Sequence, residues 1–208
     1  MPIITELQVQ KKNNERVSLF LDGEFRCGLS KISVLTYRLK VGSELSEERL
    51  AEILQESEVQ IAFDRSLALL ERYVKTERQM KDYLVQKGFA PSVADGAIDR
   101  LKRYGYIDDA TYARFYVENG IRQKGKRRLQ QELRQKGIER DLTEEILSDV
   151  QEEVSVAVAE GLKYLRGAPV TDRAVKAKVY RHLAARGFES ETILSALRQM
   201  SEGVEEDE

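Results

Sequence analysis

A chain of 208 residues that is 41% hydrophobic and 34% charged can bury a core, but an aromatic content of 7% favours several small cores over one large one. The single cysteine, Cys27, and the single histidine, His182, exclude an intramolecular disulfide and a Cys/His metal cluster, and the sparse use of thiols fits a reducing compartment. The formal net charge is only −2, and neither a membrane helix of roughly 20 apolar residues nor a signal-peptide core is evident, so we expect a cytoplasmic protein.

Residues 1–29 alternate apolar and polar side chains, which predicts three short strands. The apolar sets are Ile3, Leu7 and Val9; Val17, Leu19 and Leu21; and Phe25, Cys27 and Leu29. Asn13-Asn14 separates the first two strands, and Asp22-Gly23, which tolerates the positive φ angles of a tight hairpin, separates the second from the third. We expect a small antiparallel sheet covered by helices over 30–39 and 46–54.

From residue 59 onward the apolar period changes from two to about 3.6 residues and predicts helices throughout. Three phrases in this part resemble one another: DYLVQKGFA, QELRQKGIE and RHLAARGFE. Their glycines, Gly88, Gly137 and Gly187, follow one another at intervals of 49 and 50 residues. Such an interval fits a unit of three helices with short loops, so we predict three tandem repeats.

Each of these glycines is predicted to end one helix and separate it from the next. Apolar residues stand four and eight positions before the glycines, and ten and thirteen positions after them, at the spacing of one helix face. The preceding set is Met80, Leu84, Leu129, Leu133, Val179 and Leu183, and the following set is Ile98, Leu101, Leu147, Val150, Leu197 and Met200. Glycine adopts the left-handed conformation that ends many helices, and the basic residue before it suits the helix dipole.

A further helix is predicted before each pair, over residues 60–73, 110–121 and 153–165. Thr76 with Gln79, and Asp141 with Glu144, have the spacing of a capping box and predict helix starts. We therefore expect a mainly α fold of three tandem three-helix repeats preceded by a small antiparallel β-sheet with helices. The predicted boundaries are 1–58 for the sheet subdomain, 59–110, 111–152 and 153–200 for the repeats, and 201–208 for an acidic tail.

The most specific motifs lie at the end of the first repeat and in the second. Gly105-Tyr106-Ile107-Asp108-Asp109 is followed by Tyr112-Ala113, and Lys124-Gly125 is followed by the run from Glu132 to Ile138. With the triple spacing of the glycines, these residues give the chain a resemblance over nearly its whole length to RecX, the family of bacterial regulatory proteins of the RecA recombinase. Lys126 stands where many members have proline.

The resemblance implies tandem three-helix modules in a curved array that bind along the helical groove of the RecA filament on DNA. It also implies that the protein restrains RecA, with reduced strand exchange, ATP hydrolysis and coprotease activity during DNA repair, homologous recombination and the SOS response. We accordingly expect two kinds of partner, the RecA filament and weakly bound single- or double-stranded DNA. We expect no membrane partner, no cofactor and no metal, and a monomeric chain that is not an enzyme.

Basic side chains concentrate in the same helix of every repeat. Residues 121–140 carry eight cations against two acids, residues 171–186 five against one, and residues 72–88 five against two. Cations at matching positions of a stacked array form one stripe, which attracts polyanions through counterion release. The predicted filament- or DNA-binding residues are Arg78, Lys81, Arg122, Lys124, Lys126, Arg127, Arg128, Arg134, Lys136, Lys176, Lys178 and Arg181.

Arg127 and Arg128 follow Gly125 at a predicted helix start, where backbone N–H groups also favour an anion. Reversing both to glutamate is predicted to abolish inhibition of RecA without unfolding the chain. The alternative interpretation of all these cations is a solvated helix surface, which is the ordinary place of Lys and Arg.

Other residues give weaker signals. The tyrosines, Tyr73, Tyr104, Tyr106, Tyr112, Tyr116, Tyr164 and Tyr180, are more often edge-of-core residues than base-stacking platforms, and none is assigned to stacking. Asp108 and Asp109 precede a helix, which favours capping over acid/base chemistry, and His182 is expected at a surface or boundary. No phosphate loop, nucleophile elbow or zinc signature supports catalysis.

Two other functions remain open at this point. One is a free-standing DNA-binding protein with helix-turn-helix-like modules and no recombinase partner, and the other is a helical scaffold that binds only protein. Binding to bare and to RecA-coated DNA at matched salt separates the filament regulator from the DNA-binding protein, and the scaffold predicts little salt dependence. The acidic residues from Glu202 to Glu208 are a further open point, because they either compete with the basic stripe or only solubilise the chain.

Overall fold

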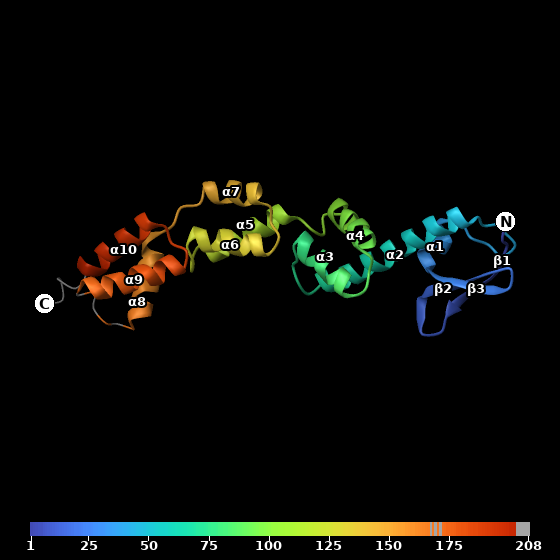
Figure 1. The fold of residues 1–208 in the computed structure, drawn as a ribbon, viewed down its shortest axis with the longest axis horizontal. Helices are drawn as coiled ribbons and strands as arrows, with labels where there is room; N and C mark the ends of the chain where they lie inside the picture. The colour runs from blue at the N-terminus through green and yellow to red at the C-terminus, as the bar shows by residue number, and fades with distance from the viewer. Residues whose placement is uncertain (167, 169, 171, 203–208) are drawn as a thin grey trace. The chain divides into compact units, whose positions relative to one another are not determined.

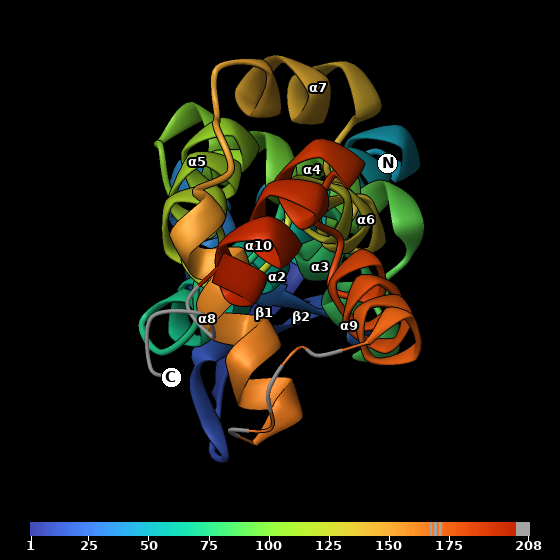
Figure 2. The same ribbon diagram turned by 90° about the vertical axis from the view of Figure 1, so that its left-hand side faces the viewer.

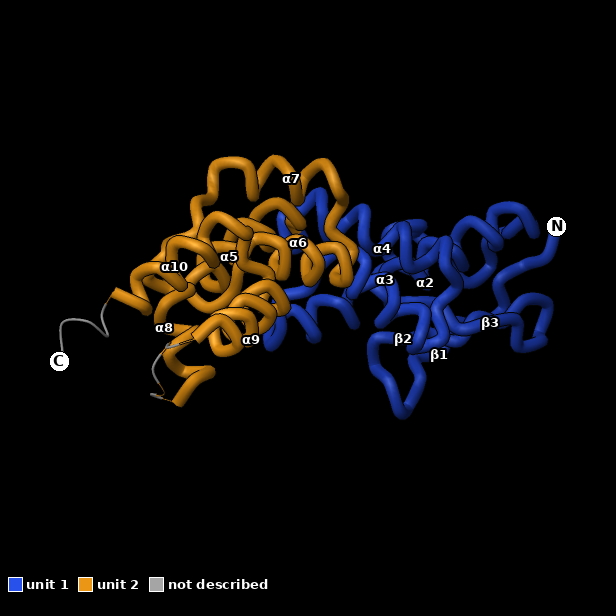
Figure 3. The backbone as a smooth tube through the Cα atoms, turned by 60° about the vertical axis from the view of Figure 1, so that its left-hand side comes forward, with its two compact units in different colours: residues 1–107 blue, residues 108–208 orange. Residues whose placement is uncertain are grey.

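The mainly α fold with a small N-terminal sheet is confirmed. The computed structural model describes residues 1–166, 168, 170 and 172–202, and the greater part of the predicted acidic tail, residues 203–208, lies outside this range. The described part contains three strands and ten helices (Figure 1). The backbone divides into two compact units, Met1–Ile107 and Asp108–Glu208 (Figure 3).

Unit 1 begins with an antiparallel sheet in the order β1-β2-β3, formed by β1 (Ile4–Gln10), β2 (Asn13–Leu21) and β3 (Glu24–Ser30). The predicted hairpin turn is confirmed, since Asp22 and Gly23 both have positive φ, 49° and 87°. The first turn was misplaced by two residues. It lies at Lys11-Lys12, and Asn13 already belongs to β2, where it pairs with Gln10.

Register shifts change which apolar residues of the sheet reach the core. A shift between Ile4 and Glu6 leaves Thr5 unpaired, so that Ile4 is fully buried while Ile3, in the predicted set, is 43% exposed. A second shift places Phe25 opposite Phe20, and Phe25 is 60% exposed. The strict alternation predicted from the sequence was therefore wrong at both positions, because each extra residue turns the following side chains to the other face.

The helices over the sheet also differ from the prediction. After the short α1 (Lys31–Thr36), the two helices expected over 46–54 and 60–73 form one continuous helix, α2 (Glu47–Leu70). Its first half packs Leu50 and Ile53 against the sheet, and its second half packs Val59 and Ala62 into the next core. The predicted boundary at residue 58 thus lies inside a helix that two cores share.

The first helical bundle combines the second half of α2 with α3 (Glu77–Gln86) and α4 (Pro91–Arg103). The predicted capping box at the start of α3 is present, because Thr76 and Gln79 exchange hydrogen bonds with each other's backbone N–H groups. The predicted apolar residues Met80, Leu84, Ile98 and Leu101 are all buried.

Unit 2 contains two bundles. The second bundle consists of α5 (Asp109–Gly120), α6 (Lys126–Gln135) and α7 (Arg140–Ser148). The third bundle consists of α8 (Val154–Leu165), α9 (Arg173–Ala185) and α10 (Ser190–Glu202), and these three helices pack on one another (Figure 2). The second helix of each bundle buries its predicted leucine and ends before a glycine with φ of +90° or +91°, namely Gly88, Gly137 and Gly187. These predicted helix ends are confirmed.

The predicted capping box of Asp141 and Glu144 was wrong. Helix α7 begins at Arg140 with Glu139 at its N-cap, so Asp141 already lies in the first turn. The turn at Gly137 places Ile138 in the core, and the chain re-enters a helix directly after it.

The second and third bundles meet at a tightly bonded joint, formed by Gly125, Glu152 and Gly187. The amide of Lys126 donates to Oε1 of Glu152 (2.6 Å) and the amide of Glu189, directly before α10, donates to Oε2 (2.8 Å). One carboxylate therefore caps a helix of each bundle. The backbones also touch, because the amides of Gly125 and Arg127 donate to the carbonyls of Arg186 and Gly187, each at 3.1 Å.

Candidate functional site

The predicted binding residues all lie at least partly on the surface, but they differ in how their charge is used. Five have partners: Lys81 pairs with Asp95, Lys124 and Arg128 with Glu132, Arg134 with Glu144, and Lys136 lies over two tyrosine rings. The other seven have no carboxylate partner among the residues that the structure describes: Arg78, Arg122, Lys126, Arg127, Lys176, Lys178 and Arg181. These seven retain the most charge for a partner.

Helix geometry decides which cations share a face. At about 100° per residue, Arg127 and Arg134 fall on one side of α6, while Arg128 turns toward Glu132. In α9, Lys176 and Lys178 are about 200° apart and face opposite sides, whereas Lys178 and Arg181 share one. The basic residues of α9 therefore do not form one stripe. That cations of all three bundles share a common surface stays a prediction.

Two tyrosines and three cations gather between α5 and α6. The rings of Tyr112 and Tyr116 are stacked, with centroids 6.1 Å apart and planes 11° from parallel. The Lys136 ammonium lies 5.9 and 5.0 Å from their centroids, and that of Lys124 lies 5.8 Å from the Tyr116 ring. Both rings remain partly exposed. The α5–α6 cluster consists of Tyr112, Tyr116, Lys124, Arg128, Glu132 and Lys136.

Glu132 is the anchor of the α5–α6 cluster. Its carboxylate accepts from the Tyr116 hydroxyl (2.7 Å), Lys124 Nζ (2.8 Å) and Arg128 Nε (2.8 Å), and its side chain is only 13% exposed. Burial alone would raise the pKa of Glu132, but the hydrogen bonds from these three donors hold the pKa at about 2. Burial and the bond to Glu132 raise the pKa of Tyr116 to about 12. Glu132 thus stays a carboxylate and Tyr116 a neutral phenol across neutral pH.

The α5–α6 cluster combines a net positive charge with two partly exposed ring faces, which is typical of surfaces that bind single-stranded nucleic acid. It brings together three predicted residues, Lys124, Arg128 and Lys136, with two tyrosines that the sequence did not assign to a site. The available signal was the four-residue spacing of Tyr112 and Tyr116, which places both rings on the α5 face next to α6.

The predicted anion site at the start of α6 is occupied from within the protein. The amide of Lys126 donates to Glu152, that of Arg127 to the Gly187 carbonyl, and that of Arg128 to the Gly125 carbonyl. The anion at this helix N-terminus is therefore the Glu152 carboxylate, and all three amides already have acceptors within the protein. Helix α6 begins at Lys126, the position at which many members have proline, and Gly125 is its N-cap.

Charge loss at Glu132 is expected to give the protein a specific acid sensitivity. Because the folded-state pKa is depressed from 4.5 to about 2, the stabilisation is complete above pH 4.5 and is lost as the pH falls toward 2. Glu132→Gln should lower the free energy of unfolding by about 3 kcal/mol at pH 7 and by progressively less below pH 4.5. Urea unfolding of both proteins from pH 7 to 2.5 measures this difference; a constant difference would contradict the assignment.

Other residues lie in structural roles. Asp108 caps α5 by accepting from the Thr111 amide (3.0 Å), and the Thr111 hydroxyl bond lowers the pKa of Asp108, so the predicted capping is confirmed. His182 is partly buried, as expected, but it has partners: it stacks on Tyr164 and its Nε2 lies 3.1 Å from Glu160. Tyr104 and Tyr106 are exposed and lie edge-to-face with each other, and the half-buried Phe63 lies edge-to-face with Tyr106 and tilted to Tyr104.

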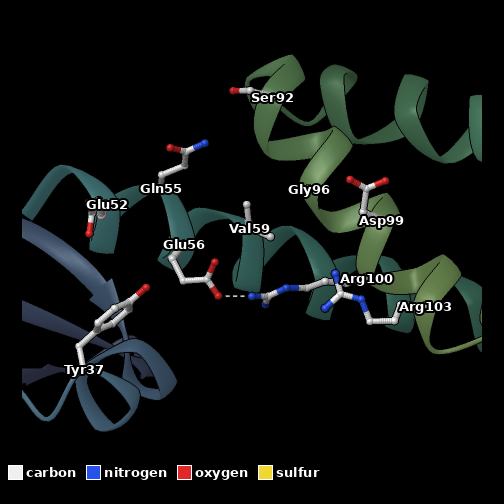
Figure 4. Close-up of a pocket in the computed structure, with 10 residues that line it drawn as sticks. All are labelled: Tyr37, Glu52, Gln55, Glu56, Val59, Ser92, Gly96, Asp99, Arg100 and Arg103. Atoms are coloured by element: carbon white, nitrogen blue, oxygen red, sulfur yellow. Dashed lines mark hydrogen bonds and ion pairs between the residues drawn. The ribbon is translucent and has the colours of Figure 1, made fainter. Parts of the chain in front are cut away.

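A cavity of about 440 Å³ lies in unit 1 between α1, α2 and α4 (Figure 4). Arg100 pairs there with Glu56 and donates to Gln60, so the most enclosed cation of the cavity is already neutralised. Three acids and two bases line the cavity, so neither sign of charge dominates: Glu52, Glu56, Asp99, Arg100 and Arg103. Within the described ranges no His/Cys/Asp/Glu group suits a metal ion, and no helix there has the length and hydropathy to span a membrane.

Comparison with known families covers most of the chain. Four family models match in order: the regulatory protein RecX N-terminal domain over residues 2–46, and the first, second and third three-helix domains of RecX over 62–101, 108–147 and 151–197. The chain belongs to the RecX family. The resemblance inferred from the motifs is thereby confirmed, as are the three helical repeats.

Individual RecX relatives agree over the full length. The Regulatory protein RecX of Bacillus subtilis is 31% identical, with 100% of this chain and 80% of that protein covered, and that of Clostridium beijerinckii is 29% identical, with 96% of both covered. A crystal structure of regulatory protein RecX, 26% identical, matches 98% of this chain with a TM-score of 0.74. A crystal structure of RecX from Lactobacillus salivarius, at 21% identity and a TM-score of 0.62, covers 69% of this chain and 96% of its own, and shows the same fold over that part.

RecX membership assigns a regulatory role and places the site within the family's domains. The α5–α6 cluster lies entirely in the second three-helix domain, and the joint connects this domain with the third.

Proposed function

We propose that this RecX-family chain regulates RecA, most directly as an inhibitor that binds in the helical groove of the RecA–DNA filament. Binding there restrains strand exchange, ATP hydrolysis and coprotease activity in the bacterial cytoplasm during DNA repair, homologous recombination and the SOS response. The chain acts as a monomer, without a cofactor and without catalysis of its own. The observation that carries the proposal is the match of all four RecX domains in order along one chain.

The surface of the second three-helix domain supports a partly nucleic-acid target. The α5–α6 cluster offers ring faces and a net positive charge, and Arg127 adds an exposed cation with no carboxylate partner in the described structure. Several modest contacts in linked domains raise the overall affinity through effective concentration, so no single deep site is needed. This fits a partner that repeats along its length, as a filament does.

A free-standing DNA-binding protein is the second candidate, favoured by the same cationic and aromatic surface. The two candidates differ in how they respond to RecA. A groove binder prefers DNA that RecA has already coated, while a plain DNA binder is excluded from it.

The deciding experiment is co-sedimentation of the chain with bare single-stranded DNA and with RecA-coated DNA at matched salt. We expect at least tenfold tighter binding to the coated form and inhibition of RecA ATP hydrolysis at the same concentrations. Equal or weaker binding to coated DNA would favour the second candidate. Binding that is insensitive to salt would instead indicate a scaffold that contacts only protein.

A further inference from the structure

A groove of about 350 Å³ lies beside the joint in unit 2. It is formed by the turn after α5, the length of α8 and the end of α9. The residues that matter for its chemistry are Arg122, Ser155, Glu160, Lys163 and Arg186. Of these five, only Arg122 is among the binding residues predicted from the sequence. Lys163 lies outside all three basic segments.

Three cations and one carboxylate face this groove, and the carboxylate is already engaged. Glu160 lies 3.1 Å from His182 Nε2 and 3.0 Å from Arg186 Nε, and its side chain is 15% exposed. Arg122 and Lys163 are exposed and have no carboxylate partner in the described part of the chain. Among the described residues, the terminal nitrogens of Arg186 make only a long bond, 3.4 Å from Nη2 to the Gln123 carbonyl. The groove therefore has donors and positive charge left for a ligand.

We propose that this groove binds a phosphodiester group of a nucleic-acid backbone. Two guanidinium groups and one ammonium approach it from three different elements, and the tetrahedral phosphate presents oxygens in several directions to match them. A carboxylate has two coplanar oxygens, which a single guanidinium already satisfies. A phosphodiester is thus the better fit to this set of donors than an acidic side chain.

The residues that line the groove also predict which part of a nucleic acid it recognises. None of the described residues that line it is aromatic, so it has no platform for a base, and the small side chains of Ser155 and Ala159 leave it open along α8. It accordingly holds the backbone without sequence preference, while ring contacts are left to the α5–α6 cluster. The inference rests on the proposed function for the presence of a nucleic-acid strand in the filament.

Binding of fluorescein-labelled oligothymidylate, followed by anisotropy at a series of salt concentrations, tests the groove directly on the full chain. Lys163→Glu and Arg122→Glu are each expected to weaken binding about tenfold at low salt and to reduce the slope of log affinity against log salt by about 0.7. Lys163→Gln should give a smaller loss of the same kind. The matched control is Arg198→Glu, an exposed charge reversal on α10 outside the groove, which should leave the slope unchanged.

Two outcomes would overturn the assignment. One is that Arg198→Glu weakens binding as much as Lys163→Glu, which would make the effect one of overall charge. The other is that polyglutamate competes with the oligonucleotide as well as an unlabelled oligonucleotide of equal charge, which would indicate an acidic protein surface as ligand. RecA inhibition is measured separately, so the groove can fail either of these tests while inhibition of RecA by the parent chain leaves the proposed function standing.

Discussion

Replacing Gly187 with alanine is expected to destabilise unit 2 by several times the effect of the same change at Gly88. Both glycines end the second helix of a bundle with nearly the same φ, +91° and +90°. A Cβ at Gly88 meets nothing within 4 Å, so Gly88→Ala costs only the left-handed backbone, about 1 kcal/mol. A Cβ at Gly187 would come within 2.3 Å of the Arg128 backbone nitrogen, which forces the two bundles apart.

Separation of the bundles breaks the bonds of the joint as well. The amides of Lys126 and Arg127 then lose their acceptors, Glu152 and the Gly187 carbonyl. We expect the free energy of unfolding of Gly187→Ala to fall by about 3 kcal/mol or more in total. Gly125→Ala isolates the steric part, because Gly125 has an ordinary φ of −76° while its Cβ would lie 2.1 Å from the Gly187 carbonyl carbon.

Hydrogen exchange of the Lys126 and Arg127 amides, together with urea unfolding, measures this effect. We expect faster exchange at both amides in Gly187→Ala and Gly125→Ala, and protection equal to the parent protein in Gly88→Ala. Similar losses of stability for Gly88→Ala and Gly187→Ala would mean that the cost at Gly187 comes from its left-handed backbone alone, and that contacts of the joint add nothing to the stability.

Arg127→Glu is expected to lower the affinity for the RecA–DNA filament at least tenfold and to leave the melting temperature unchanged. Arg127 is exposed, and its side chain has no carboxylate partner in the part of the chain that the structure describes. Reversal of its charge therefore removes a contact with a polyanion without breaking an internal one. Inhibition of RecA ATP hydrolysis should decline in parallel.

The neighbouring Arg128→Glu carries the same change in charge but a different consequence. Arg128 Nε bonds Glu132 at 2.8 Å, so a glutamate there sets two carboxylates against each other beside the tyrosines and lowers stability by about 2 kcal/mol. The predicted double reversal of Arg127 and Arg128 thus mixes binding with stability, and the single variants separate them.

Lys12→Glu, in the exposed turn between β1 and β2, is the matched control for net charge. It should retain filament binding within about twofold. If Arg127→Glu also retains full inhibition, the placement of the binding face on α6 is wrong, whereas an equal loss in Lys12→Glu would assign the effect to the charge of the whole chain.

The repeats, the helix ends and the buried stripes could be predicted from sequence because each depends on residues close together in the chain. Gly88, Gly137 and Gly187 adopt the conformation that glycine accepts most readily, and leucines four residues earlier complete a face of the same helix. The cations were also found by composition, since local excess of charge needs no tertiary contact. The tertiary structure was needed to show which of these cations are neutralised by a carboxylate.

The tertiary structure alone decided the features that join distant residues. Glu152 caps amides that lie 26 and 37 residues away, and Arg100 of α4 reaches Gln60 of α2 across 40 residues. The extra residues in the sheet and the sharing of α2 between two cores likewise follow from packing. The polar run at 55–58 stays helical because the two halves of the helix on either side of it pack into cores. Local preference fixes where helices end, whereas long-range burial and hydrogen bonding decide which surfaces they leave for a partner.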